Sequence, residues 1–119
     1  VNEEVNSLDS LDFLYNVLTD NPTIIIELQA HTDSRGKQAY NQDLSQRRAE
    51  SCVQYLESKG ITAERMVAKG YGKGRLRITD AQIAAMGTEE EKEAAHQKNR
   101  RTEFTVLSFD YVPREETDN

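Results

Sequence analysis

The sequence predicts a two-layer α/β sandwich in which helices cover one face of a small mixed sheet. Two observations lead to this prediction. Apolar residues recur with helical and then with strand periodicity, and the resulting elements follow in the order helix, strand, helix, strand, long connection and strand. The 119 residues fit one domain, which we expect over residues 7–109, followed by an acidic tail over residues 110–119. The other face of the sheet is expected to stay solvated or to meet a partner.

The chain is expected to begin with a helix and a strand. Apolar residues spaced by three and four predict a helix over residues 7–18, and Pro22 follows its end. Residues 23–30 alternate in the manner of a strand, which places every second side chain on the same face. The face that carries the larger share of apolar side chains comprises Ile24, Ile26 and Leu28.

A second helix is expected after a loop over residues 31–43. Asp43, with Gln46 three residues later, resembles a capping box that begins this helix, and Gly60 is expected to end it. The apolar side chains of the helix form one buried stripe. The stripe comprises Leu44, Ala49, Cys52, Val53 and Leu56.

The second half of the chain contains two further strands. We expect a short strand over residues 66–68 and a final strand over residues 102–109. The connection over residues 75–98 is polar and partly helical, and it is too rich in charge to belong to the core. A parallel strand-helix-strand unit leaves the 31–43 loop at the carboxyl end of its first strand, where ligands of open α/β sheets collect.

Composition excludes several classes of function. Lys and Arg number 15 against 21 Asp and Glu, and the resulting net charge of −6 argues against nucleic-acid binding. No apolar run is long enough to insert into a bilayer. Cys52 is the single cysteine, so neither an internal disulfide nor a cysteine-rich zinc site can form. His31 and His96 lack a metal-ligand spacing, and we expect no metal and no cofactor.

Asp33 and Arg48 are candidate ligand-binding residues. A strand end, a loop and a helical turn can bring them together, with a carboxylate for an ammonium group and a guanidinium for a carboxylate. Such a site suits a zwitterion, and Asn41 could add an amide contact. From spacing alone a simpler interpretation is favoured, in which Asp33 forms a turn and Arg48 is a solvated helix residue. No serine has a paired base at catalytic spacing, so a hydrolase is unsupported.

A series of motifs around the loop and the last strand adds to this interpretation. It comprises Ile26-Glu27-Leu28-Gln29-Ala30-His31-Thr32-Asp33, Gly36, Asn41, Leu44-Ser45, Arg48-Ala49, Tyr55-Leu56, Gly60, Gly70-Tyr71-Gly72 and Asn99-Arg100-Arg101 with Glu103. In this order, the motifs resemble the peptidoglycan-binding signature of the OmpA-like C-terminal domain family, which includes OmpA, Pal and MotB-like domains. The resemblance covers residues 7–108.

This resemblance implies a βαβαβ-type fold and noncovalent binding to the cell wall. It implies that Asp33 and Arg48 hold the two ends of the diaminopimelate side chain in the peptidoglycan stem peptide. Thr32, Asn41 and Leu44 would line the same pocket.

Arg100 and Arg101 are expected to point to opposite faces of the last strand. One of the two, which we take to be Arg100, is expected to approach the pocket. The other is expected to form a surface pair with a glutamate. The run Glu89–Glu93 is interpreted as solvated surface.

The chain departs from the family pattern in two places. Residues 1–6 are too short and polar to supply the opening strand and rim loop, so the first strand is expected to be missing or truncated. The connection between Gly74 and Lys98 is longer than in many relatives. The segment from His96 to Phe104 also resembles domains of Bacteroidota envelope proteins, including the periplasmic part of their type IX secretion apparatus.

The resulting prediction is a nonenzymatic anchor that ties a larger envelope protein to peptidoglycan. It would lie in the periplasm of a Gram-negative bacterium, associated with the outer membrane and the cell wall. The alternative is an interaction module that docks a secretion or motor partner through residues 75–98. An enzyme such as a cell-wall amidase would need a metal or nucleophile cluster that the sequence does not offer.

Overall fold

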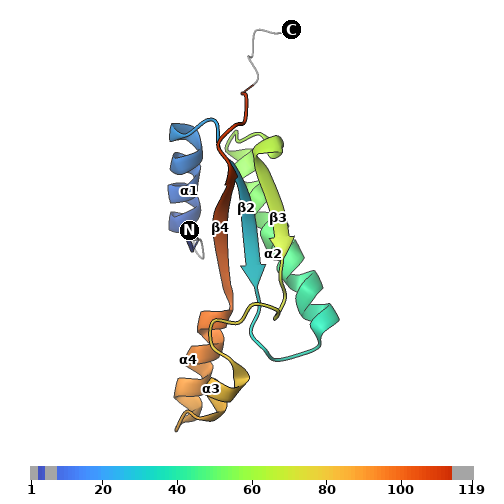
Figure 1. Cartoon of the computed structure of the whole chain (residues 1–119), viewed down its shortest axis with the longest axis vertical. Helices are drawn as coiled ribbons and strands as arrows, with labels where there is room; N and C mark the ends of the chain where they lie inside the picture. The colour runs from blue at the N-terminus through green and yellow to red at the C-terminus, as the bar shows by residue number, and fades with distance from the viewer. Residues whose placement is uncertain (1–2, 5–7, 114–119) are drawn as a thin grey trace.

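The computed structural model describes residues 3–4 and 8–113. Its elements follow the expected order, with an additional short strand at the start and an additional short helix in the long connection (Figure 1). They are β1 (Glu3–Glu4), α1 (Leu8–Asp20), β2 (Ile25–His31), α2 (Gln38–Ser58), the 3₁₀ turn η1 (Ala63–Arg65), β3 (Met66–Gly70), α3 (Asp80–Ala84), α4 (Glu89–Asn99) and β4 (Arg101–Ser108).

The strands form one mixed sheet in the order β1-β4-β2-β3. β2 and β3 are parallel and joined by α2, whereas β4 runs antiparallel to β2. β1 pairs antiparallel with β4 and places Glu3 opposite Phe104. A first strand is therefore not missing, and Glu3 and Glu4 belong to it, contrary to the expectation that residues 1–6 supply no strand.

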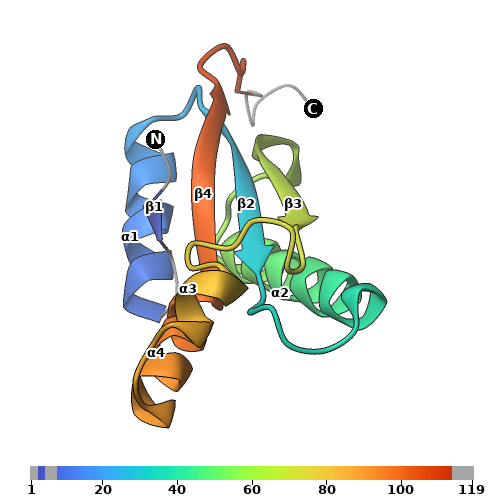
Figure 2. The same cartoon turned by 60° about the horizontal axis from the view of Figure 1, so that its bottom comes forward.

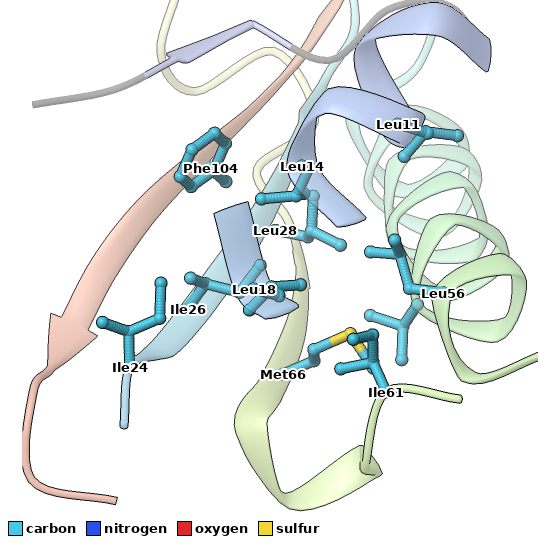
Figure 3. Packing of buried hydrophobic residues seen from close by; sticks show 11 residues of the cluster. Leu11, Leu14, Leu18, Ile24, Ile26, Leu28, Leu56, Ile61, Met66 and Phe104 are labelled. Atoms are coloured by element: carbon cyan, nitrogen blue, oxygen red, sulfur yellow. The ribbon is translucent and has the colours of Figure 1, made fainter. Parts of the chain in front are cut away.

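The core lies between one face of the sheet and the helices α1 and α2 (Figure 3). Alternation along β2 directs the side chains of Ile26 and Leu28 to this face, where Ile24, just before the strand, is also buried, as expected from the sequence. The buried cluster comprises Leu11, Leu14, Leu18, Ile24, Ile26, Leu28, Val53, Leu56, Ile61, Met66 and Phe104. Cys52 is half-buried against it, and burial raises the pKa of its thiol.

The opposite face of the sheet is polar. At the end where β2 stops and β4 begins, it is covered by the connection after β3. Gln29, His31, Arg101 and Glu103 are all buried there. Figure 2 shows the connection after β3 crossing in front of β2 on its way to α3. Arg101 Nη2 donates to the carbonyl of Arg75 in this connection at 3.0 Å. This end of the face is therefore neither solvated nor left for a partner.

α2 begins earlier than the sequence pattern indicates. Its first residue is Gln38, and Asp43 lies inside the helix rather than at its cap. The carboxylate of Asp43 instead accepts from Nε of Arg47, one turn later, at 2.9 Å. The capping prediction was wrong because an acidic side chain that can cap a helix can also pair with a base at i+4. Asn41 consequently lies on the helix and not on the loop, and Leu44 lies on the helix as expected.

The long connection is more ordered and more buried than its charge indicates. Thr79 and Gln82 form a capping box that begins α3, and the hydroxyl of Thr88 accepts from the backbone N–H of Glu91 at the start of α4. Small and aliphatic side chains of these helices are buried despite the surrounding charge. They are Ile83, which is 5% exposed, and Ala95, which is 2% exposed.

The far end of the sheet is closed by Arg65. Its buried guanidinium donates to the carbonyls of Ile24, Leu18 and Asn21 at 2.7–3.0 Å, which ties η1 to the end of α1. Beyond β4, Tyr111 donates its backbone N–H to Thr23 at 2.9 Å. Residues 114–119 of the expected tail lie outside the described residues. Within the described residues, no helix has the length and apolar character needed to cross a membrane.

Candidate functional site

Three segments meet where β2 and β3 end and β4 begins (Figure 2). The loop after β2 is joined to the turn after β3 by a bond from Thr32 N to the carbonyl of Gly72, at 2.9 Å. Tyr71 N donates in the same way to the carbonyl of Ala30, also at 2.9 Å. The loop meets the junction of α4 and β4 through an ion pair between Asp33 and Arg100. This edge gathers most of the residues that the sequence singled out.

The close contact between β3 and α2 explains the glycine at the end of β3. A Cβ atom at Gly70 would lie 2.2 Å from the backbone nitrogen of Gln46 and 2.5 Å from Oγ of Ser45. Ser45 is fully buried, and its Oγ accepts from the N–H of Gly72 at 2.9 Å. The turn after β3 is therefore held against α2, next to the loop after β2. Gly72 has φ of 53° and belongs to this turn.

Asp33 is the central carboxylate of this edge. Its side chain is 10% exposed. Oδ1 accepts from the backbone N–H of Arg35 at 2.9 Å, and Oδ2 accepts from Nη2 of Arg35 at 2.8 Å and from Nη1 of Arg100. Burial alone would raise the pKa of Asp33, but the hydrogen bonds from the two arginines outweigh it and lower the pKa to about 2. Asp33 is therefore ionised at neutral pH.

Asp33 belongs to a ring of four alternating charges, which we call the ion ring: Asp33, Arg35, Glu93 and Arg100. Nη1 of Arg35 lies 3.0 Å from Oε1 of Glu93, and Nη2 of Arg100 lies 2.9 Å from Oε2 of the same carboxylate. Hydrogen bonds from Arg100 and Arg35 lower the pKa of Glu93. The two carboxylates and two guanidiniums sum to zero charge, and the ring links the loop after β2 to α4.

Thr32 and Asn41 form a polar frame beside the ring. Both are buried. The hydroxyl of Thr32 donates to the carbonyl of Asp33 at 3.0 Å, and Nδ2 of Asn41 donates to the carbonyl of Arg35 at 2.8 Å. Both side chains thus fix the backbone that carries the ring.

Leu44 and Arg48 follow on α2. Leu44 is half-buried, and Arg48 is exposed. Within residues 3–4 and 8–113, no hydrogen bond or ion pair joins Arg48 to Asp33 or to another side chain. The expected partnership of the two residues on a ligand stays a prediction.

Of the two adjacent arginines, Arg100 reaches the ion ring and Arg101 begins β4. Arg100 directly follows α4 and is three-quarters buried, as its 26% exposed side chain shows. Arg101 is the first residue of β4, and its Nε donates to Oε1 of Glu103 at 2.9 Å. The pairing with a glutamate was expected, but its place on the surface was wrong, because both side chains are covered by the connection after β3.

Beside Arg101 lies a stack of flat side chains. The rings of His31 and Tyr71 are parallel, with centroids 5.4 Å apart, and the guanidinium of Arg75 lies 3.8 Å from the Tyr71 ring. Nε2 of His31 is 3.2 Å from Oε1 of Glu103. Burial, followed by the charge of Arg101, lowers the pKa of His31 to about 4. His31 is therefore neutral at neutral pH, and this contact is not an ion pair.

Two members of the ion ring were not predicted from the sequence. Arg35, which lies between the motif residues Asp33 and Gly36, had no assigned role, and Glu93 was interpreted as solvated surface. Glu93 is indeed 56% exposed, yet it bridges both arginines. Glu93 lies two helical turns before Arg100, which directly follows α4, and this spacing is the signal that could have found it. In the described part of the chain, no group of His, Cys, Asp and Glu could hold a metal.

The chain is similar to a known protein family and to proteins from several bacteria. A family model described as OmpA family matches residues 5–103. The peptidoglycan-associated lipoprotein of Buchnera aphidicola is 36% identical over 103 residues, which cover 85% of this chain and 54% of that protein. A Gloeobacter violaceus protein named photosystem I P700 chlorophyll a apoprotein A2 is 40% identical over 88 residues, which cover 74% of this chain and 10% of that protein.

The solved structures include a relative with the same arrangement of elements. The crystal structure of the peptidoglycan-associated lipoprotein from Burkholderia pseudomallei has a TM-score of 0.68 and 27% identity, covering 83% of this chain and 75% of that chain. This chain spans about half or less of the length of the two curated relatives named above.

Proposed function

Because the chain belongs to the OmpA family, we propose that it binds peptidoglycan noncovalently and makes or breaks no covalent bond. The names of the Buchnera and Burkholderia relatives support this proposal, since both are peptidoglycan-associated lipoproteins. The observation that carries it is the ionised carboxylate of Asp33 at the sheet edge, framed by the buried side chains of Thr32 and Asn41.

The ligand that this edge would take is the diaminopimelate of the stem peptide. The free end of its side chain carries an ammonium group and a carboxylate. Asp33 would accept the ammonium. Arg48, which is exposed, would bind the carboxylate through two parallel hydrogen bonds. Leu44 and Arg100 would line the same region.

Binding would anchor a larger envelope protein to the wall. The proposed location is the periplasm of a Gram-negative bacterium, next to the outer membrane. Two charged contacts at a partly solvated edge correspond to dissociation constants of about 1 μM to 1 mM. Tethering to a larger protein or the presence of several copies would supply the additional strength of attachment.

We predict that a soluble muropeptide containing diaminopimelate shifts backbone amide signals of residues 32–44 in an NMR titration. Asp33→Asn should lower the affinity by about thirtyfold or more, which corresponds to about 2 kcal/mol or more, because the ammonium loses its charged partner. Arg48→Lys should also weaken binding, since lysine keeps the charge but loses the two-pronged geometry. Arg47→Lys, at the neighbouring exposed arginine, is the matched control and should bind as the unchanged chain does.

Two outcomes would contradict these assignments. If Arg48→Lys binds as well as the control, Arg48 is not part of the site. If the amide signals of the unchanged chain do not shift at millimolar muropeptide, the proposal that this chain binds peptidoglycan is wrong. The alternative, a protein interaction module, is then favoured. In that case α4 is the element to test, because its first turn presents Glu89, Glu90 and Glu91 to solvent.

A further inference from the structure

We propose that Arg35 determines the specificity of the Asp33 site by occupying the carboxylate until a ligand with both an ammonium group and a carboxylate replaces it. This inference rests on the proposed function and deepens it. Its basis is the ion ring, in which Arg35 already holds the position on Asp33 that a ligand ammonium would need.

The acceptor positions of Asp33 are largely used before any ligand arrives. Oδ2 accepts from both Arg35 and Arg100, and Oδ1 accepts from a backbone N–H. A carboxylate offers about four lone-pair positions in all. A ligand ammonium that is to bind with more than a single hydrogen bond must therefore displace one of the two guanidiniums.

Arg35 is the guanidinium that is easier to displace. Its side chain is 50% exposed, whereas that of Arg100 is 26% exposed. Arg100 is also held by Gln97, whose Oε1 accepts from Nη2 at 2.5 Å. The guanidinium of Arg100 contacts the side chains of Asp33, Glu93 and Gln97, whereas that of Arg35 contacts only Asp33 and Glu93 in the described part of the chain.

The backbone of the loop does not need to move during this exchange. It is fixed by bonds from Asn41 Nδ2 to the carbonyl of Arg35 at 2.8 Å and from Lys73 Nζ to the carbonyl of Gly36 at 2.8 Å. Nη1 of Arg35 also stays within reach of Glu93, at 3.0 Å in the free state. Glu93 is thus a positioning residue that keeps the released guanidinium at the edge of the site.

The released guanidinium selects the ligand by charge. A ligand with an ammonium alone would take Asp33 from Arg35 and leave it paired with Glu93 only, so one ion pair of the free chain would be lost. A ligand that carries a carboxylate beside its ammonium would restore the missing partner, because a carboxylate offers about four acceptor positions and can accept from Arg35 as well as from Arg48. Arg35 therefore disfavours simple amines and accepts zwitterions.

The test compares two stem tripeptides, one with diaminopimelate and one with lysine as the third residue. The lysine side chain ends in an ammonium group but lacks the carboxylate found beside it in diaminopimelate. Binding of each is measured by NMR titration to the unchanged chain, Arg35→Gln and Arg35→Lys. In Arg35→Gln the lysine peptide should bind about three- to tenfold more tightly, because the competing charge is gone. Arg35→Lys keeps a competing charge and should bind the lysine peptide as the unchanged chain does.

Arg47→Gln is the matched control, because it removes one exposed, paired arginine outside the ion ring. Arg35→Gln keeps the backbone bond to Oδ1 of Asp33, so the loop should keep its fold, which the amide spectrum reports. If the unchanged chain binds the diaminopimelate peptide but Arg35→Gln does not gain affinity for the lysine peptide, the exchange is wrong and the proposed function stands. If the unchanged chain binds neither peptide, the proposed function is wrong and the exchange falls with it.

Discussion

At the scale of single residues, the site end of the sheet holds two titratable groups in opposite circumstances. Asp33 is surrounded by donors and stays charged, whereas His31 is buried beside cations and stays neutral. His31 is 2% exposed, and in the described part of the chain neither ring nitrogen makes a hydrogen bond of good geometry, although Nε2 lies 3.2 Å from Oε1 of Glu103. The groups that face it are Tyr71, Arg75 and Arg77 from the connection and Arg101 and Glu103 from β4.

We predict that His31 makes the fold less stable in mild acid. Its pKa is about 4 in the folded chain and 6.5 in the unfolded chain, so between these values only the unfolded chain binds the proton. The free energy of unfolding should therefore fall by about 2 kcal/mol from pH 7 to pH 5 through this group. Urea unfolding at the two pH values measures it. His31→Phe keeps the stack on Tyr71 and should abolish this part of the pH dependence.

His96→Gln is the control for this prediction, because it removes the other histidine and leaves His31 in place. The control should keep the full loss of stability between pH 7 and pH 5. An equal pH dependence in His31→Phe and in the unchanged chain would show that His31 takes up its proton in the folded state as well.

At the scale of elements, periodicity predicts the core helices and strands, but their ends depend on contacts distant in sequence. The alternation in β2 indicates its buried face correctly, because solvent exclusion imposes a period of two on any half-buried strand. The start of α2 at Gln38 could not be predicted, since Asp43 offers equally good local interactions as a cap and as the partner of Arg47. Likewise, α3 is too short for periodicity to reveal it.

We predict that Gly70→Ala destabilises the packing of α2 on β3. The added Cβ would meet the backbone nitrogen of Gln46 at 2.2 Å, and backbone atoms in a helix cannot move aside as the end of a side chain can. The free energy of unfolding should fall by about 3 kcal/mol, at the upper end of the usual cost of overpacking. Gly87→Ala is the control, because its Cβ would meet only Glu91 at 3.9 Å, and it should change stability by less than about 0.5 kcal/mol.

Chemical unfolding in urea, followed by far-UV circular dichroism, compares the two glycine variants. Similar stability of Gly70→Ala and Gly87→Ala would mean that α2 and β3 separate at low cost. The site would then lack a rigid support at the turn after β3.

At the scale of the whole molecule, the two ends of the sheet are built differently. Hydrogen bonds from the buried guanidinium of Arg65 to backbone carbonyls close one end. Ion pairs and side-chain amides hold the other end, where the candidate site lies. Asp33 and Arg100 could be predicted as site residues because the motifs that contain them occur in the same order as in the family signature. The role of Glu93 depends on how the connection folds back against the loop after β2, and that arrangement is set by tertiary contacts rather than by local pattern.

Asn99 holds the connection to the start of β4. Its side chain is fully buried, its Oδ1 accepts from the backbone N–H groups of Arg77 and Ile78, and its Nδ2 donates to the carbonyl of Ile78, each at 2.9 Å. One side chain thus satisfies three backbone groups of a segment that lies between two elements. Because a buried polar group without a partner is costly, this segment depends on Asn99.

We predict that Asn99→Ala loosens the site end of the molecule without unfolding its core. The amide hydrogens of Arg77 and Ile78 should exchange with solvent at least about tenfold faster, because about 1.4 kcal/mol or more of local protection is lost. The amide of Leu28, in the central strand, should exchange as in the unchanged chain. Hydrogen exchange followed by NMR separates the two regions. Equal acceleration at Leu28 would show that the connection and the core unfold together, so that the site end and the apolar core form a single cooperative unit.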